Sequence, residues 1–105
     1  MADIRKAAFK EKFVKDLTFS DFKVAVSGNV MSLREGGFLL GDGSGEVYIT
    51  IAEMEKNPGC REKDVVRVMG RIVPYDEGFE IQAEIVQNLN GIDMGALKRI
   101  KESLL

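Results

Sequence analysis

Two segments of the chain share one pattern that strongly limits the possible folds. Residues 23–30 read K-V-A-V-S-G-N-V and residues 65–72 read V-V-R-V-M-G-R-I, so both follow x-V-x-V-x-G-x-(V/I). The alternation of apolar positions with a period of two predicts strands. A glycine inside a strand costs stability and marks a bend, a bulge or a close backbone approach, as at the corners of small barrels. The matching Gly28 and Gly70 therefore predict two strongly coiled strands of one barrel.

The segment between these two strands has the pattern of a hairpin. Residues 38–40, Phe-Leu-Leu, precede the sequence Gly-Asp-Gly-Ser-Gly at 41–45, and apolar and polar residues then alternate over 46–51. The glycine loop lacks the Lys-Ser/Thr of a P-loop and does not open a helix, so a tight turn is favoured over a phosphate cradle. Phe38 has the same parity as Leu40 and is predicted to lie in the core.

Three further stretches complete the expected order of elements. Residues 52–56 are compatible with the start of a helical turn that Asn57-Pro58-Gly59 would end, and Pro74–Gly78 is predicted to be a turn. The last strand places its apolar residues on one face: Phe79, Ile81, Ala83 and Ile85.

Both ends of the chain have helical patterns. Asp3 caps a predicted helix over about residues 4–12, although residues 13–17 are equally compatible with an extended chain. Over about residues 93–105, Leu97, Ile100 and Leu104 form an apolar stripe at spacings of three and four, opposite Lys and Arg side chains.

Composition excludes several classes of protein. The chain has 105 residues, no histidine and one cysteine, Cys60. The absence of histidine excludes histidine-based catalysis, and the single cysteine excludes Cys-rich metal sites and intramolecular disulfides. We also find no cofactor loop. We therefore expect neither an enzyme nor a cofactor or metal site. No apolar run is long enough for a membrane span, and the N-terminus lacks the apolar core of a signal peptide. We therefore expect one cytoplasmic domain over residues 1–105.

The net charge of -2 is unevenly distributed along the chain. Residues 23–88 carry seven Lys and Arg against eleven Asp and Glu, which gives the strand region a charge of about -4. The segments before and after it are each about +1. Such a barrel has no broad basic groove, so any binding of nucleic acid is expected to be of modest affinity.

The ordered series of strands over about residues 13–89 resembles the nucleic-acid-binding OB-fold group. The segments that carry this resemblance are V24-x-V26-x-G28-x-V30, F38-x-L40-x-D42-G43-S44-G45-x-V47, D64-V65-V66-R67-V68-x-G70-x-I72 and G78-F79-E80-I81. The resemblance implies an all-β, five-stranded Greek-key barrel with flanking N- and C-terminal helices. Within the group, the chain looks most like the archaeal-type single-OB subunits related to replication protein A.

This resemblance implies that the chain binds single-stranded nucleic acid, with DNA favoured over RNA, in a complex for DNA replication or repair. In the related complexes the middle subunit carries one OB domain followed by a helix that packs against sister subunits. Two alternatives remain open. The barrel acts mainly in protein interaction, as its acidic charge favours, or it is an RNA-binding OB domain of the anticodon-recognition kind.

An OB-fold binds chains across its second and third strands and the adjoining loops. Single-strand binding uses cations for phosphates and aromatic rings for base stacking. Alternation predicts that Tyr48 and Thr50 point outward on the ligand face, with Arg34 in the first loop and Tyr75 in the loop after the fourth strand. A surface Tyr that covers barrel backbone, or a Tyr75 that packs on Pro74, would explain the two tyrosines equally well.

Arg67 and Arg71 share the outward face of the fourth strand. They are candidates for phosphate contacts, but pairing with the outward Glu80, Gln82 and Glu84 of the neighbouring strand is slightly favoured.

The C-terminal stripe of Met94, Leu97, Ile100 and Leu104 is the candidate surface for a second OB-containing subunit. Either this helix closes one end of the barrel or it presents the stripe to another chain. Both interpretations remain open from the sequence.

Overall fold

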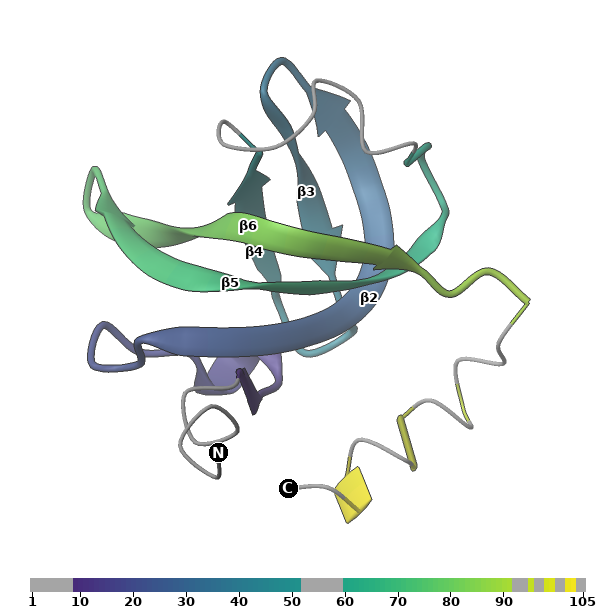
Figure 1. Cartoon of the computed structure of the whole chain (residues 1–105), viewed down its shortest axis with the longest axis horizontal. Coiled ribbons are helices and arrows are strands. Elements are labelled where there is room, and N and C mark those ends of the chain that lie inside the picture. Colours follow the sequence, from purple (N-terminus) through teal and green to yellow (C-terminus); the bar gives the residue numbers. More distant parts are fainter. Residues whose placement is uncertain (1–8, 52–59, 92–94, 96–97, 100–101, 104–105) are drawn as a thin grey trace, which may run out of the picture.

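The strand β2 (Lys23–Arg34) closes the sheet into a barrel. The computed structural model describes residues 9–51 and 60–91 and positions 95, 98, 99, 102 and 103. The first half of β2 pairs antiparallel with β5 (Val65–Tyr75), and its second half pairs antiparallel with β3 (Gly37–Gly41). Figure 1 shows how strongly β2 curves between these two partners.

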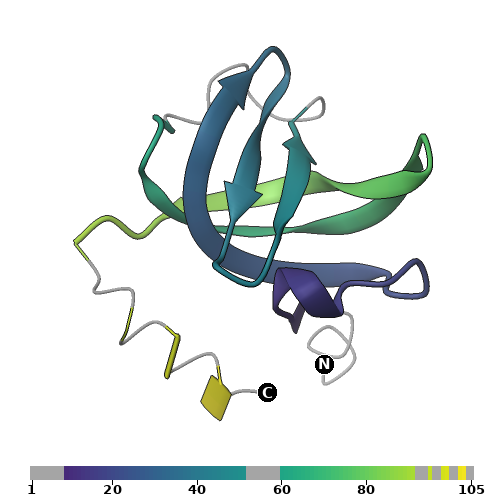
Figure 2. The same ribbon diagram turned by 180° about the vertical axis from the view of Figure 1, so that it is seen from behind.

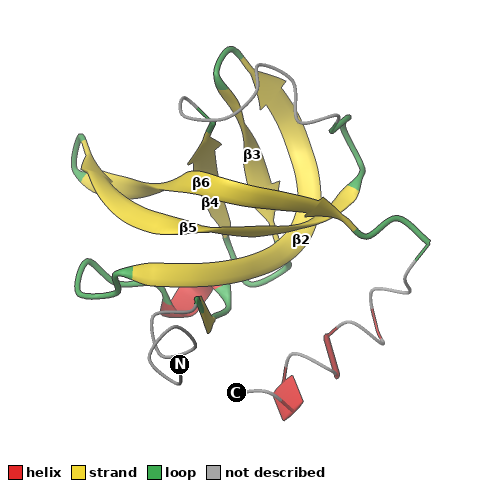
Figure 3. Cartoon of the chain, viewed as in Figure 1, coloured by secondary structure: helices red, strands yellow, loops and turns green. Residues whose placement is uncertain are grey.

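The remaining strands complete the circle. β3 continues through a hairpin into β4 (Glu46–Thr50), β4 pairs parallel with β6 (Gly78–Asn88), and β6 pairs antiparallel with β5. The circular order is thus β2-β3-β4-β6-β5 and back to β2. Strands make up nearly all of the described regular structure (Figure 3). The predicted all-β, five-stranded Greek-key barrel is confirmed.

The two matching glycines lie where backbones approach most closely. A Cβ at Gly28 would lie 2.3 Å from the carbonyl oxygen of Gly41, and a Cβ at Gly70 would lie 2.2 Å from that of Gln82. No side chain fits at such distances, so the prediction of close approach at coiled strands is confirmed.

The core fills the barrel with inward residues of all five strands. Phe38 is 1% exposed, which confirms its predicted place, and Phe79 is partly buried against the core. The largest fully buried side chains are Phe38, Leu40, Ile49, Ile81, Val24, Val26, Val30, Val66 and Val68.

Two irregularities in strand register change which residues face outward. The register of β5 with β6 shifts between Met69 and Gly70, so that Ile85 pairs with Met69 and is 43% exposed. The prediction that Ile85 shares the buried face of Ile81 was therefore wrong, because a bulge reverses the alternation. A second shift, between Val30 and Ser32 of β2, leaves Met31 exposed.

The N-terminal segment differs from its prediction. Within the predicted helix over residues 4–12, Lys10–Glu11 form a short strand, β1, parallel to β2 beside Val24 and Ala25. The free edge of β2 at this point offers backbone hydrogen bonds to a strand, whereas an isolated helix of this length is only marginally stable. Residues 1–8 lie outside the described residues.

A 3-10 turn, η1 (Val14–Asp16), covers one end of the barrel beside the β3–β4 hairpin. Figure 2 shows it against the lower end of that hairpin. The Val14 N–H donates to a carboxylate oxygen of Asp42 at 2.9 Å, and the Lys15 N–H donates to Ser44 Oγ at 3.1 Å. The Ser44 N–H and hydroxyl also donate to Asp42, at 2.9 and 2.7 Å. The glycine loop is thus a tight turn, as predicted.

Two predicted helical segments fall wholly or partly outside the described residues. Residues 52–56 are not described. In the C-terminal segment Gly95, Lys98, Arg99, Glu102 and Ser103 have helical conformation and are exposed. In the part of the chain that the structure describes, no helix is both long and apolar enough to cross a membrane.

Candidate nucleic-acid interface

The outer face of β4 carries Glu46, Tyr48 and Thr50, because Val47 and Ile49 point into the core. Tyr48 is half-buried and lies between Leu39 of β3 and Glu80 of β6 in the cross-strand register. The predicted outward position of Tyr48 in the middle of the strand is therefore confirmed.

Arg34 lies beside Tyr48. Its guanidinium carbon is 5.9 Å from the centroid of the Tyr48 ring, within the range of a cation–π contact. The Tyr48 hydroxyl donates a long hydrogen bond, 3.5 Å, to the carbonyl oxygen of Glu35. Arg34 is the last residue of β2 and not a loop residue as predicted, because β2 continues through its bulge to meet Gly37. An aromatic ring and a cation that forms no ion pair within the described part of the chain thus stand together on one face.

Thr50 and Arg71 belong to one cross-strand row. Thr50 pairs with Gln82 of β6, and Gln82 pairs with Arg71 of β5. The Arg71 Nε donates to Gln82 Oε1 at 3.2 Å, which confirms the predicted pairing across the strand. This row continues the outer face from β4 towards β5.

Arg67 lies elsewhere. Its guanidinium forms an ion pair with Glu11 of β1, and its register partners are Ser27 and Gln87. The expected cross-strand partners were Glu80, Gln82 and Glu84, and β1 supplies another carboxylate instead. Arg67 is thus separated from the Tyr48 face and already neutralised.

Tyr75 ends β5 at the tip of the β5–β6 hairpin and is 59% exposed. It was predicted in the loop, but its backbone pairs with Gly78, so the turn itself is only Asp76-Glu77. Tyr75 makes no described contact with Tyr48.

An exposed aromatic group at the start of β2 was not identified from the sequence. Phe19 and Phe22 are 61% and 67% exposed, and the Phe19 ring meets the Phe79 ring edge-on at 5.2 Å. The Phe22 carbonyl accepts a hydrogen bond from the Ile72 N–H. These phenylalanines precede the first regular strand pattern, so no alternation indicated their side.

Two chemical features bear on other kinds of site. Burial, followed by the nearby Asp64 charge, raises the pKa of the Cys60 thiol, so that it stays protonated and weakly nucleophilic. Over residues 9–51 and 60–91 and the described helical positions, no three His, Cys, Asp or Glu side chains are grouped to hold a metal ion.

Comparisons with known proteins agree on the architecture. A chain of the S. pombe Stn1–Ten1 complex superposes with a TM-score of 0.74 at 19% identity, over 91% of this chain and 90% of that one. The telomere capping protein Ten1 from Saccharomyces pombe gives 0.74 at 19% identity, over 91% and 96%. A chain of a replication protein A heterotrimer bound to single-stranded DNA gives 0.60 at 16% identity, over 76% and 67%.

No protein-family model matches the sequence, and no curated protein sequence matches it. The similarity to known proteins is therefore one of fold. The circular strand order and the three superpositions together show that this chain has the OB-fold.

Proposed function

We propose that this chain binds single-stranded DNA across the outer face of β3 and β4, as a non-enzymatic subunit of a replication protein A-like complex in DNA replication or repair. The observation that carries the proposal is the pairing of Arg34 with Tyr48 on that face. Stacking on a tyrosine ring and neutralisation of a phosphate by an arginine are the two contacts that single-strand binding needs.

The contacts of the described residues support one path for the strand across this face. A base on Tyr48 places its phosphate near Arg34, and the row of Thr50, Gln82 and Arg71 continues the polar outer face. Tyr75, exposed at the hairpin tip, is then a clamp at the far end. Arg67 has no part in this path, because Glu11 neutralises it.

The charge of the barrel sets the strength of binding. With eleven acidic against seven basic residues over 23–88, a bound strand meets few cations. Affinity therefore rests on stacking more than on phosphate contacts, and we expect it to be modest for the chain alone.

The second part of the proposal concerns a partner. Similar folds occur in the Stn1–Ten1 complex and in a replication protein A heterotrimer. We propose that the stripe of Met94, Leu97, Ile100 and Leu104, which lies outside the described residues, binds a second OB-containing subunit in a cytoplasmic, archaeal-type complex. In support, the polar residues Lys98 and Glu102 line a cavity of about 250 Å³ with Phe13, Lys15 and the β3–β4 turn, so a polar side of this helix borders the barrel.

The test is a titration of labelled, short single-stranded DNA by fluorescence anisotropy at low salt. Wild-type protein and Tyr48→Phe should bind alike, and Tyr48→Ala should bind about tenfold more weakly, as expected for the loss of one stacked base. Equal binding by all three proteins would remove Tyr48 from the interface. A matched RNA strand, which differs by its 2′-hydroxyls, tests the expected preference for DNA.

A protein-interaction role without direct DNA binding is the second candidate. The exposed Phe19 and Phe22 and the acidic barrel favour it. No binding of any oligonucleotide in dilute buffer, together with assembly on a partner, would establish this role instead.

A further inference from the structure

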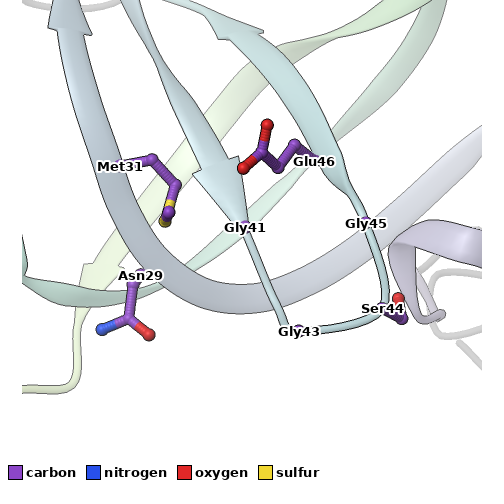
Figure 4. Close-up of a pocket in the computed structure, with 7 residues that line it drawn as sticks. All are labelled: Asn29, Met31, Gly41, Gly43, Ser44, Gly45 and Glu46. Carbon is purple, nitrogen blue, oxygen red and sulfur yellow. The ribbon is translucent and has the colours of Figure 1, made fainter.

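A depression of about 570 Å³ lies on the outer face of the barrel, at the end of β3 near the glycine turn. Three strands and the turn contribute its lining: Asn29, Met31, Gly41, Gly43, Ser44, Gly45 and Glu46 (Figure 4). Asn29, Gly41 and Glu46 form one cross-strand row. With neighbouring strands about 4.8 Å apart, Asn29 and Glu46 stand roughly 10 Å from each other across Gly41.

Gly41 lets the side chains of Met31 and Glu46 lie close against the middle of this row. A Cβ at Gly41 would lie 3.1 Å from both Cγ and Sδ of Met31 and 3.4 Å from Cγ of Glu46. Figure 4 shows the Met31 and Glu46 side chains on either side of Gly41. The middle of the row is therefore covered by the Met31 thioether and the stem of Glu46, so one wall of the depression is polarisable and apolar and lies beside a carboxylate.

Glu46 and Asn29 bring side-chain hydrogen-bond acceptors to the depression. Among the described residues Glu46 makes no ion pair and no side-chain hydrogen bond, and it is exposed. Asn29 donates a long hydrogen bond, 3.4 Å, from Nδ2 to the carbonyl oxygen of Lys63, which leaves its Oδ1 as an acceptor. An ionised carboxylate accepts and never donates, so it selects a ligand edge that carries N–H groups.

We propose that this depression is a base-reading subsite for guanine within the bound single strand, an inference that rests on the proposed function. Guanine presents two adjacent donors, N1–H and the N2 amino group, which match the two oxygens of Glu46 in a bidentate pair. Its ring lies against the Met31 thioether.

The other bases do not present two adjacent hydrogen-bond donors to the carboxylate. Cytosine and adenine place an acceptor nitrogen beside their amino group, and thymine places its single N–H between two carbonyls. Each therefore brings an acceptor against one oxygen of Glu46, which is repulsive. A phosphate is repelled by the same negative charge, so the depression receives a base and not the backbone.

The position of the subsite fits the path proposed above. Glu46 lies two residues before Tyr48 on the same outward face of β4, which is about 7 Å along the strand. A base stacked on Tyr48 and its neighbour in the depression are then adjacent nucleotides. Tyr48 supplies affinity without sequence preference, and Glu46 supplies the preference.

The experiment compares two single-stranded DNA oligonucleotides that differ only in carrying guanine or hypoxanthine (deoxyinosine) at the central positions. Hypoxanthine lacks the N2 amino group but stacks similarly. Wild-type protein should bind the guanine strand about tenfold more tightly, as for one bidentate base contact. Glu46→Gln should lose this preference yet bind the inosine strand at least as well, because a negative charge has been removed. Glu84→Gln, which removes the same charge from β6, should keep the preference.

Other outcomes separate the two proposals. Equal wild-type affinity for both strands, or a full preference retained by Glu46→Gln, would overturn the guanine subsite while leaving DNA binding established. Absence of binding to either strand would overturn the proposed function and the subsite together. An equal loss on both strands in Tyr48→Ala supports the proposed function whatever the result at Glu46.

Discussion

Arg34 and Tyr48 reach the same outer face from different strands, with the guanidinium carbon 5.9 Å from the ring centroid. Arg34 ends β2, and Tyr48 lies in the middle of β4, with β3 between them. Each side chain restricts the freedom of the other, so less rotamer entropy is lost when a nucleotide binds. A phosphate next to a base stacked on Tyr48 would therefore lie near Arg34, and the salt dependence of binding tests whether Arg34 contacts it.

Arg34→Gln should reduce the salt dependence of DNA binding. Each phosphate contact on a single strand contributes about -0.7 to the slope of log affinity against log salt, so this variant should lose about that amount. Arg67→Gln is the matched control, because the Arg67 charge is already neutralised by Glu11, and its slope should be unchanged. Anisotropy titrations at several salt concentrations measure both, and a larger change for Arg67 would place the interface on the part of β5 around Arg67.

Alanine at either matching glycine should strongly destabilise the barrel. A Cβ at Gly28 or Gly70 overlaps a carbonyl oxygen of the next strand, at 2.3 or 2.2 Å. We expect a loss of about 3 kcal/mol in the free energy of unfolding for each variant, measured by urea denaturation. Gly78→Ala meets no atom within 4 Å and should stay within about 0.5 kcal/mol of wild type. Two nearly neutral variants at 28 and 70 would contradict the described packing.

Asp42 joins the glycine turn to η1, so its removal should loosen that end of the barrel. Its carboxylate accepts hydrogen bonds from the Val14 N–H, the Ser44 N–H and the Ser44 hydroxyl. Asp42→Ala should cost about 2 kcal/mol, since hydrogen bonds to charged groups are the stronger ones. Ser44→Ala keeps the carboxylate and should cost less. Denaturant titrations of the two variants measure their free energies of unfolding. An equal loss of stability in both would argue against a central role for Asp42.

The stability of the chain should fall in acid partly through Asp21. Burial raises the pKa of its carboxyl, but the Thr18 N–H, the Lys12 ammonium and the Thr18 hydroxyl together lower that pKa below 3.8. A depressed folded pKa means that the ionised group contributes stability above about pH 4, which is lost as pH falls through the folded pKa.

Thermal melts of wild type and Asp21→Asn across this pH range test the assignment. The melting temperature of Asp21→Asn should start lower at neutral pH and decline less steeply in acid. Asp16→Asn is the control, because the Asp16 carboxylate makes no hydrogen bond in the described part of the chain. Parallel curves for wild type and Asp21→Asn would show that Asp21 has no such role.

Acidic substitutions in the C-terminal stripe should abolish assembly with a partner. Leu97→Asp and Ile100→Asp place charges on the proposed apolar surface, whereas Ser103→Asp adds the same charge at an exposed helical position. Sedimentation of the chain co-expressed with an OB-containing partner should show dissociation for the first two variants only. Circular dichroism should show an intact barrel in all three. Unchanged assembly of the stripe variants would count against this surface.

Alternation and glycine position were sufficient to predict the barrel. The pattern shared by residues 23–30 and 65–72 indicated two coiled strands, and these segments indeed pair with each other, Val26 beside Val68. The same alternation placed Tyr48 outward, because β4 is short and regular. Local pattern suffices where strand register is regular.

Prediction failed where register is irregular or the partner is distant. A bulge at Met69 exposes Ile85, and another at Val30 exposes Met31, although neither position has a distinctive residue type. The strand at Lys10–Glu11 depends on a free edge of β2, and the ion pair of Arg67 depends on that strand. Such features follow from the assembled sheet, so no window of sequence contains them.

The two partners of β2 also affect how the chain folds. The hairpins β3–β4 and β5–β6 join neighbours in sequence, whereas the pairing of β2 with β5 joins strands that are far apart in the sequence. Contacts of such high sequence separation slow folding, because loop-closure entropy is lost before the pairing is gained. We therefore expect docking of residues 23–29 onto 65–71 to be a slow step of folding, and until it occurs the pairing edges of β2 and β5 are open to other chains.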